Sequence, residues 1–377
     1  MSRLALIYND WRGPIIADLL AGGGFTPICL DRRVGADSDS VALPMNAVRV
    51  SSVSQALKEV TAVLTVLDSQ QEDEDIYMAG GGIFEVAKPG GLFIDLSTTT
   101  PRLAKELGAL AAVHDHAFVE APLIGTRAEL ADSRARILAA GEADSLKQAL
   151  PILGVIAEEV SLTGLSGNGM AAKLAWQVSL ASSLVGLVEA LAFAAINGLD
   201  KLLMLELLTD EAHPAYSLAT EFGKAIIDED FQAGLDVKSF LSDLDIALEA
   251  ADEADLPLPG LETCQRLFDL LQLIGDDSRG IQSLALNYYD EANSQRFGLN
   301  WSLAQKAMDI YERGSSESPD DYLYDYDDED DESPGHQHGH GHALSERSAE
   351  GSGLDPYGDD SGPEDPLPSI GSYFSEN

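Results

Sequence analysis

Residues 167–173 carry the clearest candidate for acid–base chemistry in this chain. They read Gly-Asn-Gly-Met-Ala-Ala-Lys and predict the start of a helix whose next residues are almost all apolar. A lysine buried early in such a helix, here Lys173, would have a lowered pKa and be ready for proton transfer. The residues alone leave a second interpretation open, in which Lys173 extends its ammonium group along the helix to the surface.

The elements that precede this helix predict an α/β domain. Four apolar runs of strand length, separated by helical segments, lie at residues 4–8, 26–30, 60–67 and 91–96. Continuous apolar strands suit a parallel sheet that is covered on both faces. After the first run we expect a turn and a helix with Pro14 at its first position. Residues 1–165 therefore predict a Rossmann-like, doubly wound domain.

From residue 166 onward the apolar periodicity becomes helical. A long connecting helix is expected over residues 170–197, and it carries hardly a charge besides Lys173 and Glu189. A helix that is apolar on all sides must be buried, either between domains or between subunits. Helical segments continue to residue 313, so residues 166–313 predict an all-α second domain.

Composition separates a third region from the two domains. Residues 314–377 are rich in Ser, Gly, Pro and acidic residues, and we expect them to form a disordered acidic tail. Alternating histidines at 336–342 lack a preformed geometry, and no metal site is predicted. The acidic stretch at 320–332 could dock a basic protein partner or could be a solvated linker.

The charge and the cysteines limit the class of protein. A formal net charge of -41 repels nucleic acid and anionic lipid, so neither is an expected partner. Cys29 and Cys264 lie in apolar surroundings and suggest buried thiols rather than a disulfide framework. We expect no run of membrane-spanning length, and the first residues read as a strand, which predicts a cytoplasmic protein.

Several further stretches match one family in order and spacing. The chain has Pro-Gly-Gly-Leu-Phe-Ile-Asp-Leu-Ser-Thr-Thr-Thr-Pro at 89–101 and Phe-Val-Glu-Ala-Pro at 118–122. Shorter matches follow at residues 189–190, 198–200 and 243–244. Together with residues 167–173, they resemble the β-hydroxyacid dehydrogenases, which include 3-hydroxyisobutyrate dehydrogenase and relatives of 6-phosphogluconate dehydrogenase. The resemblance implies NAD or NADP as coenzyme and a dimer or tetramer formed through the helical domains.

The resemblance also implies roles for residues around the reacting atoms. Lys173 would be the catalytic acid/base, and hydride would pass between the nicotinamide and the substrate carbon. Gln177, which stands one helical turn on where the family has asparagine, would orient the substrate together with Ser97. Where the family has a lysine before the aspartate Asp243, this chain has Ser242, so a basic contact is lost.

A loop that binds the substrate carboxylate in the family is altered here. Pro122, Gly125 and Asp243 are the substrate-binding residues that the resemblance implies. The family's serine in this loop is replaced by Ile124, and its second glycine by Thr126. A branched alkyl group in place of an anion donor should reject a small carboxylate or favour a less polar substrate.

The coenzyme turn departs further from the family pattern. That pattern places glycines at positions 8, 10 and 13, because the backbone must turn tightly and touch the pyrophosphate. Only Gly13 remains, whereas Tyr8 adds bulk and Asp10 adds a carboxylate.

The other coenzyme contacts leave the choice of coenzyme open. Asp31 at the end of the second strand would accept from the ribose hydroxyls of NAD. Arg32 and its neighbour Arg33 could instead hold the 2′-phosphate of NADP. Thr98, with Ser97, would line the nicotinamide pocket, although these hydroxyls could also cap the following helix.

Two functions are therefore expected from the sequence. The first is an NAD(P)-dependent oxidoreductase of the 3-hydroxyacid dehydrogenase type, with Lys173 as acid/base. The second is a catalytically inactive family member that acts as a scaffold or regulatory subunit through its oligomer and its acidic tail. Each lost contact should cost on the order of 1–3 kcal/mol of binding or transition-state stabilisation, and these losses favour the second function.

Overall fold

The computed structural model describes residues 2–312, apart from 34–41, 214, 233 and 276. The expectations for the acidic tail, its histidines and its basic partner lie outside the described residues. The described residues belong to one compact unit.

The first part of the chain is built on one nine-stranded sheet with strand order β3-β2-β1-β4-β5-β6-β8-β7 and β9 paired to β8. Strands β1 to β6 pair in parallel, and β8 pairs antiparallel with β6 and β7. The strand bounds are β1 Arg3–Tyr8, β2 Thr26–Asp31, β3 Val48–Val50, β4 Ala62–Val66, β5 Leu92–Asp95, β6 Ala117–Glu120, β7 Leu123–Ile124, β8 Arg136–Gly141 and β9 Glu159–Gly164. The expected Rossmann-like domain is confirmed, and its strand order reverses between β1 and β4, where α/β sheets bind ligands.

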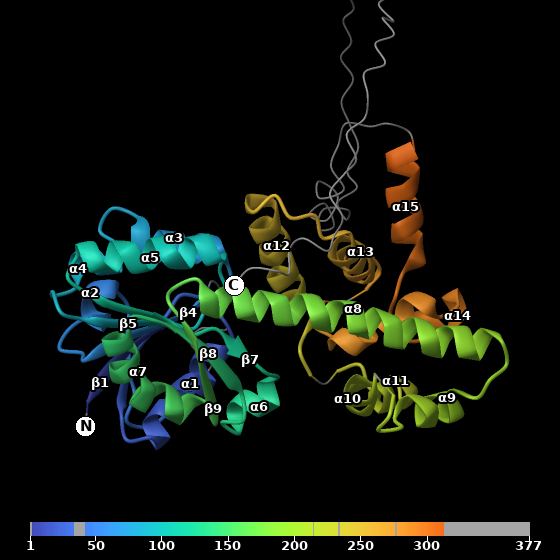
Figure 1. Ribbon diagram of the computed structural model, residues 1–377, viewed down its shortest axis with the longest axis horizontal. Helices are drawn as coiled ribbons and strands as arrows, with labels where there is room; N and C mark the ends of the chain where they lie inside the picture. Colours follow the sequence, from blue (N-terminus) through green and yellow to red (C-terminus); the bar gives the residue numbers. More distant parts are fainter. Residues whose placement is uncertain (1, 34–41, 214, 233, 276, 313–377) are drawn as a thin grey trace, which may run out of the picture. The chain divides into compact units, whose positions relative to one another are not determined.

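Helices cover both faces of this sheet (Figure 1). One face packs against α1 (Arg12–Gly22) and α7 (Ala143–Ile156). The other packs against α2 (Val53–Ala56), α3 (Gln70–Met78), α4 (Ile83–Val86) and α5 (Pro101–Val113). Helix α1 begins at Arg12, two residues before the expected start at Pro14, so the turn that follows β1 is shorter than the sequence indicated.

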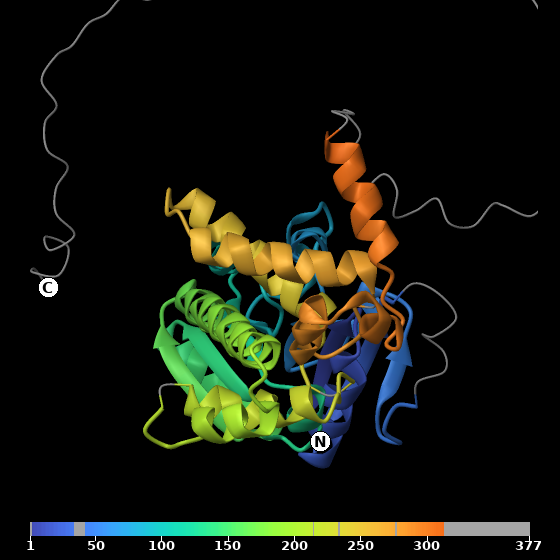
Figure 2. The same ribbon diagram turned by 90° about the vertical axis from the view of Figure 1, so that its right-hand side faces the viewer.

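The second part of the chain is helical, as expected, and is arranged around α8 (Asn168–Ile196). Figures 1 and 2 show α12 and α13 on one side of α8 and α9 to α11 on the other. The bounds are α9 Lys201–Leu208, α10 Tyr216–Leu218, π-helix η1 Ala219–Gly223, α11 Lys224–Ile227, α12 Val237–Glu253, α13 Pro259–Ile274, 3-10 helix η2 Ile281–Tyr288, α14 Glu291–Gln295 and α15 Trp301–Glu312. This part has its own core, centred on Phe240 and Phe268.

Helix α8 is buried on one face only. Leu184, Leu187 and Leu191 face the helical core, whereas Phe193 and Ile196 are 71% and 84% exposed. Within the described residues, α8 is also the one helix long and apolar enough to cross a membrane. Our expectation that no run reaches that length was therefore wrong, although one face of α8 packs against α12, α13 and η2.

Candidate functional site

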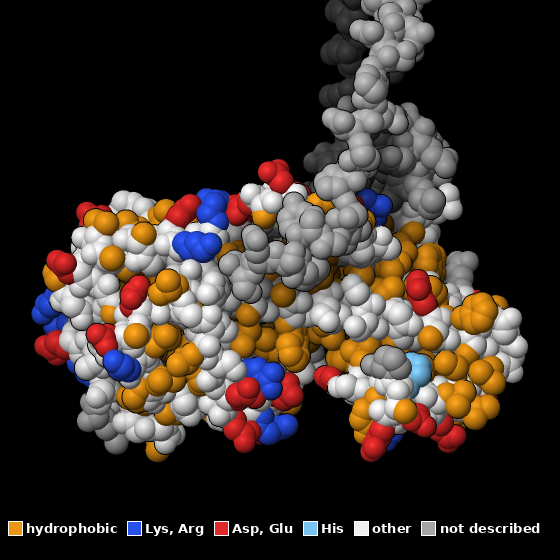
Figure 3. All heavy atoms as spheres, viewed as in Figure 1, with side chains coloured by type: hydrophobic (Ala, Val, Ile, Leu, Met, Phe, Trp, Pro, Cys, Tyr) orange, Lys and Arg blue, Asp and Glu red, His pale blue; other side chains and the backbone are white. Residues whose placement is uncertain are grey.

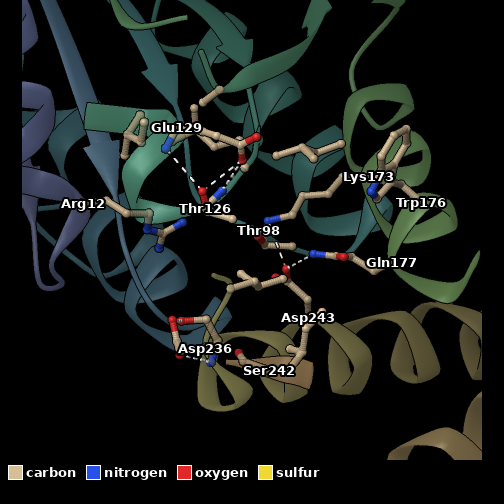
Figure 4. Close-up of a pocket in the computed structure, with 18 of the residues that line it drawn as sticks. Arg12, Thr98, Thr126, Glu129, Lys173, Trp176, Gln177, Asp236, Ser242 and Asp243 are labelled. Carbon is tan, nitrogen blue, oxygen red and sulfur yellow. Dashed lines mark hydrogen bonds and ion pairs between the residues drawn. The ribbon is translucent and has the colours of Figure 1, made fainter. Parts of the chain in front are cut away.

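A cavity of about 720 Å³ opens at the carboxyl ends of the sheet strands. The turn after β1, the segment from β7 into α6 (Arg127–Ala131), and helices α8 and α12 all contribute to its lining. Figure 4 shows Lys173 and Gln177 entering from α8, Asp243 from α12, and Arg12 from the opposite side. Residues distant in sequence are thus brought to one place.

Lys173 is 4% exposed and lies at the centre of this cavity's polar groups. Its Nζ donates a short hydrogen bond to Thr98 Oγ1 and lies 3.2 Å from Asp243 Oδ2. Burial lowers the pKa of Lys173, and the charge of Arg12 acts in the same direction, whereas Asp243 opposes the shift. The snorkelling interpretation is therefore wrong, because the side chain is buried and paired.

Gln177 and Asp243 form the second polar contact of the cavity. The amide Nε2 of Gln177 donates to Asp243 Oδ2 over 2.6 Å. A carboxylate only accepts hydrogen bonds, so the nitrogen of the amide must face Asp243. The other amide atom, Gln177 Oε1, is buried and has no hydrogen-bond partner among the described residues.

The start of α8 is fixed by glycines and by one buried carboxylate. Gly167 has φ of +96°, which favours glycine, and a Cβ on Gly169 would meet the Leu138 carbonyl oxygen at 2.5 Å. Glu120, at the end of β6, accepts from the backbone N–H of Gly167 at 2.9 Å and of Gly169 at 2.7 Å. A carboxylate at a helix N-terminus satisfies otherwise unpaired amides, so Glu120 anchors the helix that carries Lys173.

Burial raises the pKa of Glu120 to about 7, despite the opposing effect of the hydrogen bonds from the amides of α8. The carboxylate therefore titrates near neutral pH while it holds the end of the helix. Glu120 stands in the Phe-Val-Glu-Ala-Pro stretch at 118–122, but sequence analysis assigned no role to it.

Ser97 and Thr98 follow β5 but point to different surroundings. Ser97 Oγ donates to Asp73 Oδ1 over 3.0 Å and accepts from the Leu67 N–H over 3.0 Å. It is fully buried and is absent from the cavity lining, where Thr98 lies instead. Burial, reinforced by the neighbouring Asp95, raises the pKa of Asp73 well above its ordinary value. The Ser97 hydroxyl is therefore bonded to Asp73 and Leu67 and does not reach the cavity, where it was expected to orient the substrate.

Tyr8 and Gly13 determine the shape of the turn after β1. Tyr8 is fully buried, and a Cβ on Gly13 would come within 2.1 Å of the Tyr8 ring. The glycine therefore makes room for an aromatic side chain of the same turn. Burial raises the pKa of Tyr8, consistent with a neutral phenol packed in the core.

Asp10 and Arg12 occupy the next part of the turn. Asp10 Oδ1 accepts from the backbone N–H of Arg12 over 2.8 Å, and Oδ2 pairs with the Arg12 guanidinium. Arg12 Nη2 donates to the Leu67 carbonyl oxygen over 2.7 Å. Asn9 and Asp68 add two hydrogen bonds of 2.6 and 2.9 Å. The loops after β1 and β4 are therefore joined across the point where the strand order reverses.

Asp31 and Arg32 lie at the end of β2, outside the cavity lining. Asp31 accepts from Arg33 and lies 3.7 Å from Arg49. Burial acts to raise the pKa of Asp31, but the hydrogen bonds from Arg33 outweigh it and the pKa is lowered. Arg32 pairs with Glu72 at 2.8 Å. The side chains expected to hold a coenzyme ribose or phosphate are thus bound to each other or to neighbours.

Comparison with known proteins identifies the family. The model described as "NAD binding domain of 6-phosphogluconate dehydrogenase" matches residues 13–164, and that described as "NAD-binding of NADP-dependent 3-hydroxyisobutyrate dehydrogenase" matches residues 167–286. The chain belongs to the β-hydroxyacid dehydrogenase family. Both of its folded parts are thus of NAD(P)-binding types, although the first match begins only at Gly13, after the altered turn.

Relatives and solved structures agree with this assignment. An uncharacterized oxidoreductase of Bacillus subtilis is 28% identical over 68% of this chain and 89% of its own length. The NAD-dependent L-serine dehydrogenase of Pseudomonas aeruginosa is 25% identical over 78% of this chain and 100% of its own length. The structure of Mycobacterium tuberculosis 3-hydroxyisobutyrate dehydrogenase with L-serine shares the fold, with a TM-score of 0.68 at 21% identity, covering 76% of this chain and 99% of that one.

In this β-hydroxyacid dehydrogenase family member, the β1–α1 turn is occupied by side chains of the chain itself. The Tyr8 ring fills the space beside Gly13, and the Asp10 carboxylate bonds the helix amide that a phosphate oxygen would use. Arg12 and the Asn9–Asp68 pair then bridge the crevice. Lys173, Thr98, Gln177 and Asp243 thus meet in the cavity, and the turn after β1 is bonded to the loop after β4.

The loop that the resemblance assigns to substrate binding lines the cavity in part. Ile124 and Gly125 line the cavity, whereas Pro122 is buried and does not. Thr126, in place of the family's second glycine, caps α6 and forms a capping box with Glu129. The substituted glycine position therefore serves local helix stability.

Arg12 is the cavity residue that sequence reasoning missed. It lies one position before Gly13 and was not assigned a role, because nothing in the sequence shows that its side chain crosses to Leu67. The one available signal was its proximity to Asp10, two residues earlier, since opposite charges in one tight turn often pair.

Proposed function

We propose that this chain is a family member that binds a small molecule at Lys173 but does not carry out NAD(P)-dependent hydride transfer. One observation carries the proposal: the crevice at the ends of β1 and β4 is bridged by the chain's own side chains. Such a protein would act as a ligand-responsive scaffold or regulatory subunit.

Electrostatics supports this proposal. Asp10 and Arg12 form a pair whose side chains are 12% and 15% exposed, and the Asp10 carboxylate already satisfies the first amide of α1. A pyrophosphate at this helix end would bring further negative charge against Asp10 and would have to displace it. Breaking a partly buried ion pair without replacing both partners is strongly unfavourable.

The test is calorimetric titration of the full chain with NADH and with NADPH, at low and at high salt. The Pseudomonas aeruginosa L-serine dehydrogenase, which is NAD-dependent by name, serves as the positive control. We expect no binding up to millimolar coenzyme. A dissociation constant in the micromolar range would overturn the proposal and identify the preferred coenzyme.

A second candidate is the NAD(P)-dependent oxidoreductase of the 3-hydroxyacid dehydrogenase type. The arrangement of Lys173 favours it, because a buried lysine with a lowered pKa between Thr98 and Asp243 suits a general acid or base. In that case Lys173 would pass a proton to or from a substrate oxygen, and Gln177 would orient the substrate. Coenzyme binding in the titration above would be its first requirement.

We also propose that the chain forms a homo-oligomer through the exposed face of α8 and α9. Phe193, Ile196, Leu202 and Leu207 are each more than half exposed there. Figure 3 shows hydrophobic side chains gathered over this end of the helical part. Contiguous apolar surface of this kind marks interaction sites in soluble proteins. Light scattering coupled to gel filtration should give a dimer or tetramer, and Phe193→Asp with Ile196→Asp should give a monomer.

A further inference from the structure

The buried oxygen of Gln177 points to the kind of ligand that the Lys173 cavity accepts. Gln177 is 4% exposed and lines the cavity, and its Oε1 has no partner among the described residues. An unpaired buried acceptor costs free energy, on the order of 1–3 kcal/mol. A ligand that brings an N–H or O–H group to this oxygen would recover that cost.

Lys173 supplies the complementary donor. An ammonium group has three N–H donors, and the described partners of Lys173 are Thr98 and Asp243. One donor is therefore left for a ligand acceptor, and Gln177 projects into the same cavity (Figure 4). Lys173 and Gln177 lie one helical turn apart on α8, so one ligand can reach both side chains.

A carboxylate ligand would have to compete with ion pairs that already exist in the cavity. Lys173 is paired with Asp243, and Arg12 with Asp10. The rest of the charged lining is mixed, with the acidic residues Asp68, Glu129, Glu221 and Asp236 and the basic residues Arg134, Arg136 and Lys238. A carboxylate at Lys173 would have to displace Asp243, whereas a neutral carbonyl group would not.

Apolar side chains make up the rest of the wall. Ile124 is the last residue of β7, and α8 and α12 add Trp176, Leu180 and Ile246. These groups suit a hydrophobic body attached to one polar head.

We propose that the cavity binds a neutral small molecule whose polar head places a carbonyl acceptor beside an N–H or O–H donor, as a carboxamide or hydroxyketone does, in preference to a carboxylate. The carbonyl accepts from Lys173, the donor bonds Gln177 Oε1, and the hydrophobic body packs on Ile124 and Trp176. The inference rests on the proposed function, because it assigns a ligand to the same cavity without coenzyme.

Matched acid and amide probes test this directly. The full chain is titrated calorimetrically with 3-phenyllactate and 3-phenyllactamide, and with 3-hydroxyisobutyrate and its amide, in the absence of coenzyme. Within at least one pair we expect the amide to bind at least about tenfold more tightly. Equal or tighter binding of both acids, or no binding by any probe at about 10 mM, would overturn the inference.

Variants separate the proposed contact from a change in folding. Gln177→Met, similar in size, should weaken amide binding about tenfold and reduce the preference for the amide over the acid. Gln71→Met is the matched control, because Gln71 is exposed on α3 and lies outside the cavity lining. Ile124→Ser restores a hydroxyl to the loop and should narrow the preference for the amide. An unchanged preference in both Gln177→Met and Ile124→Ser would contradict the inference.

The outcome is independent of the coenzyme titration. Micromolar NADH binding together with amide preference would overturn the proposed function and leave the ligand class standing. No coenzyme binding together with tighter binding of the acids would overturn the ligand class and leave the proposed function standing.

Discussion

The carboxylate of Asp10 accepts a hydrogen bond of 2.8 Å from the backbone N–H of Arg12, the first residue of α1. Helix N-terminal amides of this position are ready-made anion sites. In this chain the anion is supplied from two residues earlier, and the guanidinium of the same Arg12 completes the pair and reaches Leu67. Side chains of the turn itself therefore satisfy the first amide of α1 and bridge to the loop after β4.

Reopening this turn should restore some affinity for coenzyme. Asp10→Gly with Arg12→Met removes both charges and the bridge to Leu67 while Gly13 stays in place. We expect NADH binding to become measurable in the double variant and to stay undetectable in the natural chain. The free energy of unfolding should fall by about 1–2 kcal/mol, as for loss of a helix cap. Calorimetry and urea unfolding measure the two effects.

Its matched control is Asp144→Gly with Lys147→Met, which removes an exposed pair on α7 joined at 2.7 Å. Coenzyme binding there should not change. If Asp10→Gly with Arg12→Met folds and still fails to bind NADH, the closed turn is not what excludes the coenzyme, and the bulk of Tyr8 becomes the remaining obstacle.

The fold could be predicted because its causes are local. Continuous apolar runs such as residues 60–67 and 91–96 identify buried parallel strands, and the change of period near residue 166 marks the helical part. Helix α8 was predicted within two residues, since Gly167 and Gly169 mark its start. The start of α1 was misplaced because Pro14 was read as its first residue, although proline is tolerated anywhere in a first turn.

The site was predicted less completely, because its contacts join distant segments. Lys173, Gln177, Asp243 and Thr98 were named and do meet in the cavity. The reach of Arg12 to Leu67 depends on how β1 and β4 are paired, which no local pattern shows. Ser97 was expected beside the substrate, but its hydroxyl is taken up by Asp73 and the Leu67 amide.

Glu120 should make stability depend on pH near neutrality. Its pKa in the folded chain is raised to about 7 by burial, above the ordinary value of 4.5. The folded state thus holds the proton more tightly than the unfolded state does. Its contribution is most favourable below about pH 4.5, declines as pH rises toward 7, and is constant above that. The decline should be on the order of 3 kcal/mol.

Urea unfolding between pH 4.5 and 8 measures this effect. Glu120→Gln removes this one titration, so its stability should decline less steeply than that of the natural chain, with the decline that comes from Asp73 remaining. Glu142→Gln is the control, because Glu142 is an exposed residue preceding α7. Parallel pH profiles for the natural chain and Glu120→Gln would show that Glu120 does not titrate in this range.

Two glycines of α8 should respond oppositely to alanine. A Cβ on Gly169 would meet the Leu138 oxygen at 2.5 Å and Glu120 Oε1 at 2.9 Å, whereas one on Gly186 meets nothing within 4 Å. Gly169→Ala should destabilise the chain by about 1–3 kcal/mol through overpacking. Gly186→Ala should stabilise it by up to about 1 kcal/mol through helix propensity. Thermal unfolding measures the change in stability of each variant. A Gly169→Ala variant as stable as the natural chain would contradict the close packing of α8 on Glu120.

The Lys173–Asp243 pair should be strongly coupled in the absence of any ligand. Its side chains are 5% and 11% exposed and lie 3.2 Å apart. Removing either partner leaves the other buried without its counter-charge, so Lys173→Met and Asp243→Leu should each cost about 3 kcal/mol. The double variant should cost less than the sum by more than about 1 kcal/mol.

The exposed Arg266–Glu262 pair on α13, joined at 3.7 Å, is the control for this cycle. The coupling energy of this surface pair should be about 0.3–0.5 kcal/mol, as is usual for exposed pairs. The coupling energy of Lys173 and Asp243 should be clearly larger than that. Additive effects at Lys173 and Asp243 in urea unfolding would mean that water or other groups screen the pair. Burial and the charge of Arg12 would then lower the pKa of Lys173 without opposition from Asp243, and the lysine would be free to meet a ligand without first leaving Asp243.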